Sequence, residues 1–599
     1  MKEQISPRYF PPREKGATVL TGSVSFCTDM SDALDGGVLI YDEQDNVCRL
    51  PFSPQGRRGS LCALNVDMSV TDKHTYLYYR GSQTFLDREA KIIVGNEEWG
   101  RTDEKKLRGA FYLDDFDWGR DVAPNIPWHE SFIYGLNVRA FTMHASSGVK
   151  SRGSFAGVSA KIPYLQSLGV TAVELMPAYD FNEVETITDP ANGKESSRLN
   201  CWGFKAAHYY APKTAYAGGE RADHAFKSMV KSFHKNGMEV HMCFYFTPEI
   251  SAADTLAILR FWVLEYHIDG IHLIGHGLPF ALITHDALLS GTKLSYHEQD
   301  YWEDMPRYAN TGLFRDAYLA DVRRLIRGDE DMTAAFMYRQ KDNMPGRGVI
   351  NYLAAYGGFS LFDSVAFDKK HNAANGEKNR DGSDKNYSWN CGAEGVSRKK
   401  AIVALRTKQI KNALSLLFMS QGVPYIFSGD EFGNSRHGNN NAYCQDNDTG
   451  WVKWSKSATS QELLSYTRML SVFRKSHPIL RMKETLRGLD WQRCGYPDVS
   501  YHGAEAWRPD LYPISRTLGI MLCGTYAKYN NQCADAFIYL AINMHWQKAT
   551  LALPHLPQGL VWQMAFSSYE GASEPGLKKD SILMNERCVC VFISAHIDN

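Results

Sequence analysis

Residues Phe261–Gly277 read FWVLEYHIDGIHLIGHG, and this stretch decides the fold. Its first part has the apolar spacing of an amphipathic helix that ends near His267, where a short loop begins. Ile271–Ile274 then forms an apolar run of the length expected for a buried strand. A helix that leads directly into such a strand is the repeating unit of a parallel α/β barrel. Residues at the carboxyl ends of barrel strands face the active site, so we expect the chemistry of this chain there.

The composition is that of an ordinary globular protein with several domains. The chain has 599 residues, 44% of them hydrophobic and 22% charged. Its 66 basic and 67 acidic residues leave a net charge of −1, which gives no reason to expect nucleic acid or an anionic membrane as a partner. Aromatic residues make up 12%, which suits stacking on sugar rings and equally suits large aromatic cores.

The N-terminal segment and the cysteines favour a cytoplasmic protein. The first residues, MKEQISPRYFPPREKG, contain prolines and alternating charges and lack the apolar core of a signal peptide. No run of about 18 apolar residues follows, so we expect no membrane span. The 12 cysteines are scattered and form no C-x-x-C pair, which fits reduced thiols better than a disulfide framework.

Strand and helix patterns divide the chain into three parts. Residues 1–115 carry short β-rich runs, such as Gly37–Tyr41, and predict a small β-sandwich. Residues 116–480 alternate strands and helices and begin with a proline-bearing linker, so they predict a TIM (β/α)8 barrel. Residues 481–599 alternate apolar and polar side chains over short runs and predict an antiparallel β domain. The expected fold class is therefore α/β, with the barrel flanked by a β module on each side.

Several long segments resemble the isoamylase-type glycogen and starch debranching enzymes of the α-amylase superfamily, glycoside hydrolase family 13. The segment IYGLNVRAFT at Ile133–Thr142 is similar to the first barrel strand of that family, which is expected here over Ile133–Val138. CWGFKAAHYYAP at Cys201–Pro212 is similar to the family's YWGYNPLNFFAP, and the third and seventh strands are expected over Glu239–Phe246 and Asn351–Phe359. The loops at His371–Gly395 and Ser420–Asn447 are nearly the family's own. The resemblance implies an N-terminal carbohydrate-binding-like module, a glycosidase-type barrel and an α-glucan such as glycogen as the ligand.

The same alignment implies that the family's catalytic set is absent. In the family the deciding stretch reads EYHVDGFRFDLA, where the second Asp is the nucleophile, and here that position is an isoleucine. The flanking residues stay in register, so an alignment slip does not explain the loss. The three carboxylate positions are occupied by Ile274, His297 and Gly357, and the supporting Arg, Asp and two His positions by His272, Cys243, Pro248 and Tyr356.

Retaining glycosidases need two carboxyl groups roughly 5 Å apart, one to attack the anomeric carbon and one to protonate the leaving oxygen. An isoleucine has no lone pair and can do neither. Glu298 lies one residue after His297, and strand alternation places its side chain on the opposite face unless a bulge intervenes. The sequence therefore favours a pseudoenzyme toward α-1,6-glucosidic bonds.

The residues of the altered site suit two other roles. Cys243, His272 and His297 are expected to point into the barrel from neighbouring strands, and one Cys with two His is a workable zinc set. The competing explanation is that these side chains satisfy one another's hydrogen bonds, so we predict neither a metal nor another cofactor. His241 faces the same way but one layer deeper.

Glucan binding is the second role. Aromatic faces and amide groups around the barrel mouth suit a sugar polymer, although core packing explains each aromatic equally well. The candidate contacts are Tyr134, Trp202, Tyr209, Tyr356, Asn439, Asn440, Asn441 and Gln445.

Three functional hypotheses result. The first is an inactive debranching-enzyme homologue in glycogen or α-glucan metabolism that binds glucan, partners an active debranching enzyme or forms a homo-oligomer. The second is a working hydrolase or transferase that uses Glu298, Asp300 or the Cys243 cluster. The third is a structural interaction protein without sugar affinity.

Overall fold

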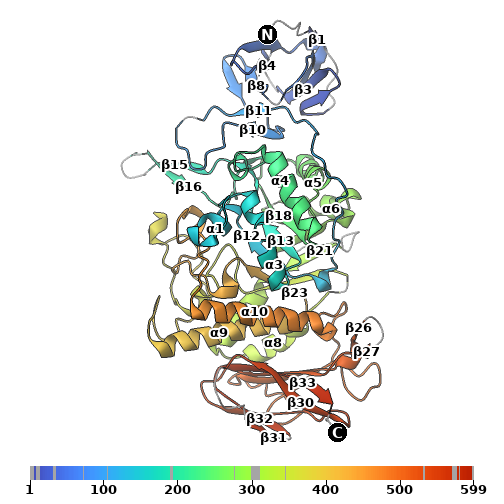
Figure 1. Ribbon diagram of the computed structural model, residues 1–599, viewed down its shortest axis with the longest axis vertical. Coiled ribbons are helices and arrows are strands. Elements are labelled where there is room, and N and C mark those ends of the chain that lie inside the picture. Colours follow the sequence, from blue (N-terminus) through green and yellow to red (C-terminus); the bar gives the residue numbers. More distant parts are fainter. Residues whose placement is uncertain are drawn as a thin grey trace.

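The computed structural model describes residues 6–8, 14–30, 35–71, 73–103, 105–188, 193, 195–275, 277–297, 310–344, 346–529, 533–569, 576–578 and 580–596. These residues form an elongated molecule with a β module at one end, a barrel in the middle and a second β module at the other end (Figure 1). The α/β fold predicted from the sequence is confirmed.

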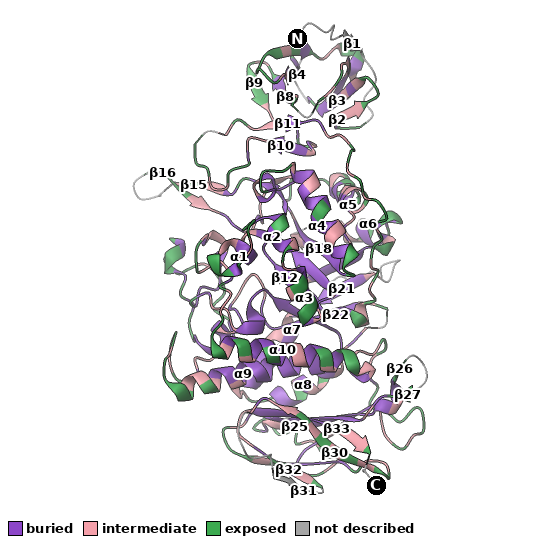
Figure 2. Cartoon of the chain, in the orientation of Figure 1, coloured by how far each residue is buried: buried purple, intermediate pink, exposed green. Residues whose placement is uncertain are grey.

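The central unit is a closed barrel of parallel strands whose neighbours follow the order of the chain. Its strands are buried and its outer helices expose one face, which is the pattern of a packed barrel (Figure 2). The barrel strands are β12 (Ile133–Leu136), β13 (Ala172–Leu175), β18 (Glu239–Phe246), β19 (Gly270–Gly275), β20 (Lys293–His297), β21 (Thr311–Phe314), β22 (Gly348–Tyr352) and β23 (Val423–Phe427).

Helices surround the barrel and connect its strands. They are α1 (Val138–Met143), α2 (Phe155–Ser159), α3 (Ile162–Leu168), α4 (Ala222–Lys235), α5 (Ala252–Tyr266), α6 (Phe280–Thr284), α7 (Asp316–Arg327), α8 (Met332–Lys341), α9 (Lys400–Met419) and α10 (Ala458–Ser476). The deciding stretch holds the expected helix end and strand. Ser251 caps α5 by accepting a hydrogen bond from the Asp254 amide at 3.1 Å, and His267 ends the helix in a left-handed conformation with φ 51°.

The N-terminal part contains two antiparallel sheets that enclose an apolar core, in keeping with a β-sandwich. One sheet has β1 (Ser6–Arg8), β7 (Leu61–Asp67), β3 (Ser23–Asp29) and β2 (Gly16–Leu20) in that order, with β6 (Arg57–Arg58) beside β7. The other has β10 (Ile92–Val94), β11 (Arg108–Ala110), β8 (Thr75–Arg80), β4 (Gly36–Tyr41) and β5 (Val47–Pro51), with β9 (Gln83–Phe85) beside β8.

The C-terminal part is also antiparallel, and its buried side chains join the same apolar cluster as the barrel helices. Its main sheet has β24 (Val499–His502), β25 (Thr517–Leu522), β28 (Ile538–Asn543), β33 (Cys588–His596) and β30 (Leu560–Ser567). Smaller sheets join β29 (Ala549–Ala552), β32 (Ser581–Met584) and β31 (Gly576–Lys578), and β26 (Lys528–Tyr529) with β27 (Cys533–Ala534).

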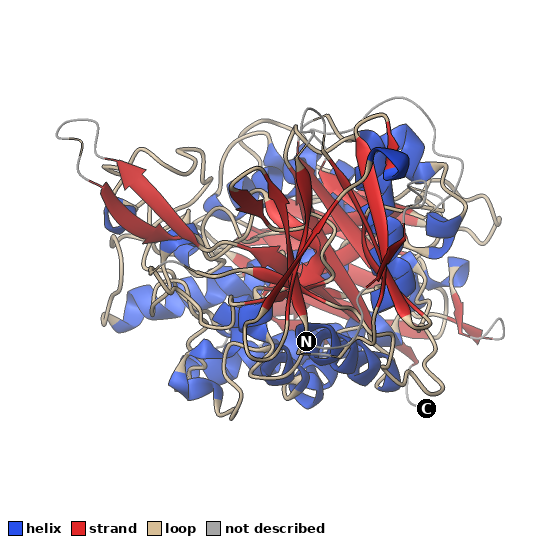
Figure 3. Ribbon diagram, turned by 90° about the horizontal axis from the view of Figure 1, so that it is seen from above, coloured by secondary structure: helices blue, strands red, loops and turns tan. Residues whose placement is uncertain are grey.

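Two further pairs of strands lie outside the barrel sheet. The strands β14 (Tyr179–Phe181) and β17 (Ala207–Pro212) pair beside its mouth. The hairpin of β15 (Val184–Thr188) and β16 (Glu195–Leu199) stands out from the body when the molecule is seen from above (Figure 3).

Two barrel strands end at least two residues earlier than the sequence predicts. The first barrel strand ends at Leu136, because Asn137 caps α1 through a hydrogen bond from the Ala140 amide to its side-chain oxygen at 2.9 Å. The seventh strand was expected over Asn351–Phe359, but β22 ends at Tyr352, so Tyr356 and Gly357 lie in the loop that follows. Among the described residues, no helix combines the length and apolarity needed to cross a bilayer.

Candidate functional site

The three positions of the predicted catalytic carboxylates lie at the carboxyl ends of barrel strands. Ile274 is the next-to-last residue of β19, and His297 is the last residue of β20. Gly357 follows β22 in its loop. All three are half-buried, as residues at a barrel mouth are. The side chains present there are an aliphatic group, an imidazole and a hydrogen atom.

A lack of space does not explain why residue 357 is a glycine. A Cβ atom built on Gly357 would have nothing within 4 Å, so a larger side chain fits without a clash. Gly135 in the barrel wall is the contrasting case, because a Cβ atom there would lie 1.8 Å from the Tyr425 hydroxyl oxygen. Packing therefore does not require a glycine at residue 357.

The supporting positions separate into buried and peripheral ones. Cys243 and His272 lie inside the barrel, each 1% exposed. Pro248 is exposed in the loop after β18, away from the barrel interior. Tyr356 is half-buried at the mouth, where its ring centroid lies 4.8 Å from that of Phe204.

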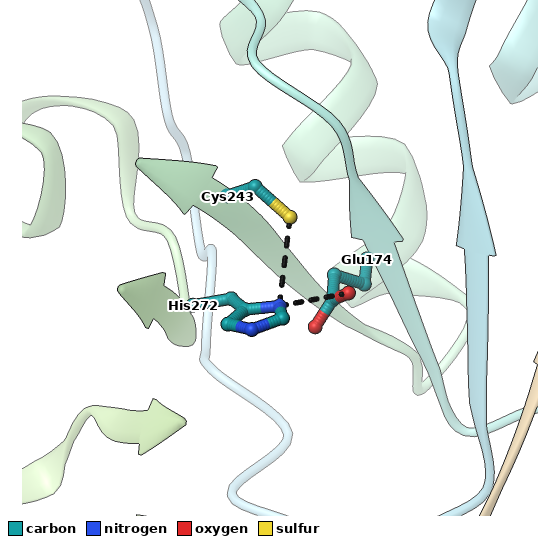
Figure 4. Close-up of side chains that lie close together, drawn as sticks. All are labelled: Glu174, Cys243 and His272. Atoms are coloured by element: carbon teal, nitrogen blue, oxygen red, sulfur yellow. Dashed lines mark hydrogen bonds and ion pairs between the residues drawn. The ribbon is translucent and has the colours of Figure 1, made fainter. Parts of the chain in front are cut away.

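Cys243 and His272 form a cluster with Glu174, which the sequence interpretation missed (Figure 4). The His272 Nδ1 atom lies 3.6 Å from Cys243 Sγ and 3.2 Å from Glu174 Oε1. Burial, together with the Glu174 charge, raises the pKa of the Cys243 thiol well above its usual value. Burial acts to raise the pKa of Glu174 as well, but the charge and hydrogen bond of His272 outweigh it and lower that pKa.

The three residues that the sequence suggested as a zinc set, Cys243, His272 and His297, do not form one cluster. His297 does not join Cys243 and His272 in the cluster, because its Nδ1 atom lies 3.0 Å from Oδ1 of Asp316 on the next barrel unit. Glu174 takes its place beside them. The one signal for Glu174 in the sequence was an acidic residue inside the apolar run VTAVELMP at Val170–Pro177.

A second polar group lies deeper in the barrel. Glu239 accepts hydrogen bonds from Lys293 at 2.5 Å and His241 at 3.1 Å. Burial alone would raise the pKa of Glu239, but these two partners outweigh it and lower the pKa. The hydrogen bond to Glu239 holds His241 in the layer below the mouth, as expected from strand alternation.

Aromatic rings line part of the mouth. The Trp202 centroid lies 5.4 Å from that of Tyr356 and 6.2 Å from that of Tyr443, both edge to face. All three rings are half-buried and so keep exposed surface. Asn441 is half-buried too, and its side-chain amide donates to Asp381 at 3.0 Å.

Burial corrects the other predicted glucan contacts. The Tyr134 hydroxyl donates to Glu431 at 2.8 Å and the Tyr209 hydroxyl to the Tyr245 carbonyl at 2.9 Å. The buried amides bond to loop partners, mostly other Asn side chains, and so hold the two long loops together. These side chains are at most 6% exposed, so they present little surface on which a polymer can stack or to which it can bond. The residues removed from the set are Tyr134, Tyr209, Asn439, Asn440 and Gln445.

The alternative acid proposed from the sequence, Glu298, and its neighbour Asp300 lie outside the described residues. The structure places another carboxylate beside His297, that of Asp316, the first residue of α7. It was missed because it lies 19 residues after His297 and carries no motif.

Comparisons with known proteins identify relatives of this chain and solved structures with a similar fold. No protein-family model matches the chain. Isoamylase 3, chloroplastic, from Oryza sativa subsp. japonica is 31% identical, covering 81% of this chain and 70% of the relative. The glycogen debranching enzyme of Erwinia tasmaniensis is 31% identical, covering 72% of this chain and 73% of the relative. Among solved structures, a Paenibacillus barengoltzii pullulanase in complex with maltohexaose and alpha-cyclodextrin superimposes with a TM-score of 0.71 at 17% identity, covering 98% of this chain and 95% of that chain.

Proposed function

Because the chain belongs to the isoamylase-type glycogen and starch debranching enzymes, we propose that it is a catalytically inactive member that binds α-glucan at the barrel mouth. The single observation that carries the proposal is the identity of the residues at the three positions of the mouth where the family resemblance expects carboxylates. Ile274 and His297 lie at strand ends, and Gly357 lies in the loop after β22. Ile274 and Gly357 have no ionisable side chain, and none of the three residues supplies the carboxylate that attacks the anomeric carbon. The His297 imidazole is held by Asp316, with Nδ1 and Oδ1 3.0 Å apart.

The size of the loss follows from the chemistry. General acid catalysis is typically worth about 10² to 10⁴ in rate, and electrostatic stabilisation of the transition state is usually larger still. Binding the substrate alone does not raise the rate of the chemical step, because ground state and transition state are then stabilised equally. A barrel without these groups therefore holds a glucan without cleaving it.

The aromatic rings at the mouth support glucan binding. Trp202, Tyr356 and Tyr443 keep exposed surface, and edge-to-face packing holds their orientations. Rings fixed in this way lose little conformational entropy when a ligand stacks on them. Of the predicted amide contacts, Asn441 remains accessible. The solved pullulanase is similar in fold and was crystallised with glucan oligosaccharides.

The proposal extends to organisation and location. We propose domain boundaries at residues 1–115, 116–480 and 481–599, and a cytoplasmic protein whose 12 cysteines stay reduced. We also propose that an active debranching enzyme is its partner on the polymer, or that the chain acts as a homo-oligomer. Two weak glucan sites on one assembly bind a long polymer far more tightly than either site alone.

The alternative function is a glycoside hydrolase with an unconventional acid. The specific observation in its favour is Asp316, a carboxylate at the mouth whose side chain is 40% exposed. A general acid needs a raised pKa to keep its proton at neutral pH. The hydrogen bonds of His297 and Tyr352 instead lower the pKa of Asp316, although burial alone would raise it. This argues against Asp316 as the acid.

Glycogen binding tests the proposal. The purified protein is run in native gels with and without glycogen, and on a column of immobilised glycogen. Retention that soluble maltohexaose reverses supports a glucan-binding protein. Equal mobility with and without glycogen contradicts it and leaves the structural interaction protein as the reading of this chain.

A further inference from the structure

Three neighbouring barrel strands bring a carboxylate, a thiol and an imidazole to one point inside the barrel. Glu174 is on β13, Cys243 on β18 and His272 on β19 (Figure 4). One donor atom of each lies within 4.8 Å of the others. All three side chains are almost fully buried, with exposed fractions of 2%, 1% and 1%.

Two of the three separations between these atoms are close to the edges of a zinc coordination tetrahedron. With Zn–S near 2.3 Å, and Zn–N and Zn–O near 2.0 Å, tetrahedral angles place sulfur about 3.5 Å from nitrogen and nitrogen about 3.3 Å from oxygen. The observed separations are 3.6 Å between Cys243 Sγ and His272 Nδ1, and 3.2 Å between His272 Nδ1 and Glu174 Oε1. We propose that Glu174, Cys243 and His272 form a zinc site in the barrel.

The ligand types favour zinc over other common metals. A hard cation such as Mg²⁺ or Ca²⁺ prefers oxygen donors alone, whereas a mixed thiolate, imidazole and carboxylate set is typical of Zn²⁺. Charge also balances, because a dication neutralises the Cys243 thiolate and the Glu174 carboxylate while His272 stays neutral. Three protein ligands leave the fourth position for water or another donor.

The barrel holds these ligands rigidly. Cys243 and His272 are direct partners in the β18–β19 register. The His272 ring stacks on Phe314 with a centroid distance of 4.3 Å and an interplanar angle of 8°. A site whose ligands are already oriented needs little rearrangement to accept a metal. The alternative is that the same three side chains form a hydrogen-bonded triad without a metal, and the metal content of the protein distinguishes the zinc site from the triad.

The test is the metal content of the full-length protein, grown with added zinc and measured by elemental analysis after gel filtration. The wild type is expected to hold one zinc per chain. Cys243→Ser and Glu174→Gln each remove a metal ligand. Loss of an outer-shell partner weakens metal binding by about ten- to hundredfold, and each of these variants should weaken zinc binding by more than that. The matched control is Cys62→Ser, a buried cysteine of the N-terminal sheet, which should bind zinc as the wild type does.

Two further readouts keep the result clear if a variant folds poorly. X-ray absorption of the wild-type protein should show one sulfur at about 2.3 Å and nitrogen or oxygen at about 2.0 Å from zinc. Added zinc should raise the Tm of metal-free wild type and of Cys62→Ser, but not of Cys243→Ser. Absence of stoichiometric zinc, a different metal in its place, or an equal Tm response in Cys243→Ser overturns the proposal. None of these outcomes bears on glycogen binding, so the two proposals fail separately.

Discussion

His297 Nδ1 lies 3.0 Å from Oδ1 of Asp316, a carboxylate of the next barrel unit. His297 is the residue where the family resemblance expects the general acid. The same oxygen accepts a hydrogen bond from the Tyr352 hydroxyl. Hydrogen bonds of this kind stabilise the charged form of Asp316 and fix the His297 ring at the mouth. The mouth therefore holds a structural polar contact at the position where the family resemblance expects a proton donor.

Replacing Asp316 tests whether this contact is structural. The lowered pKa of Asp316 means that its contribution to stability is present above its ordinary pKa of 3.8 and is lost as the pH falls below that value. Asp316→Asn should therefore be less stable than wild type at pH 7, and the two should converge in acid. Urea unfolding at several pH values measures this. A stability difference that does not change with pH contradicts the assignment, and glycogen retention should be unchanged.

The mouth aromatics make a second prediction. Trp202→Ala removes a half-buried ring at the mouth and should weaken binding to glycogen by about tenfold, which corresponds to about 1.4 kcal/mol. The control is Trp546→Ala, which removes a ring that is 55% exposed on the C-terminal β module. Affinity electrophoresis in glycogen gels compares the two. Equal losses in both variants would place the glucan outside the barrel mouth.

A buried ion pair at the joint of the N-terminal part and the barrel makes a third prediction. Glu183 accepts from Lys213 at 2.7 Å and from the Gly100 amide at 2.9 Å. Burial acts to raise the pKa of Glu183, but Lys213 and the hydrogen bonds lower it from 4.5 to about 2. A depressed pKa gives stability above pH 4.5 that is lost as the pH falls toward 2.

Glu183→Gln should accordingly cost on the order of 3 kcal/mol above pH 4.5 and progressively less below it. Thermal unfolding as a function of pH measures the difference from wild type. The exposed neighbour Glu98→Gln serves as the control and should follow the wild-type curve. A constant offset between Glu183→Gln and wild type across this range contradicts the ion-pair account.

The corrected role of Asn440 makes a fourth prediction. Its side-chain amide donates to the Ser383 carbonyl at 2.7 Å and to Asn386 Oδ1 at 2.8 Å, and its oxygen accepts from Asn372. Asn440→Ala leaves these buried partners unsatisfied and should cost about 2 kcal/mol or more. Limited proteolysis should then cut the two loops faster, whereas Asn182→Ala, at an exposed site, should not change the rate. A variant that keeps its stability and loses only glycogen affinity would restore Asn440 as a sugar contact.

The sequence predicted the fold well because local patterns carry it. The whole of β18 over Glu239–Phe246 was predicted to the residue, because its apolar run has the length and flanks of a buried strand. The end of β22 was missed by several residues, since the small residues after Tyr352 continue a strand-like pattern that the structure does not use. Such boundaries depend on pairing across the barrel, which one segment does not encode.

The site was only partly predictable for the same reason. The family resemblance assigns Ile274 and Gly357 to carboxylate positions because the segments around them stay in register, and this assignment needs only the sequence. The contacts of Glu174 and Asp316 join residues far apart in the chain and became visible only when the strands were placed side by side. Burial was the other missing quantity, since Tyr134 and Trp202 are both aromatic residues near strand ends, yet the first is fully buried.

The central claim is that this barrel binds glucan and does not cleave it. The most direct test is release of reducing sugar from glycogen and from a branched oligosaccharide, using protein from a host without its own debranching enzymes. We expect no release above a protein-free blank from a preparation that an immobilised glycogen column retains. Release at an enzymatic rate that Glu298→Gln or Asp316→Asn abolishes would contradict the claim and identify an unconventional catalytic acid.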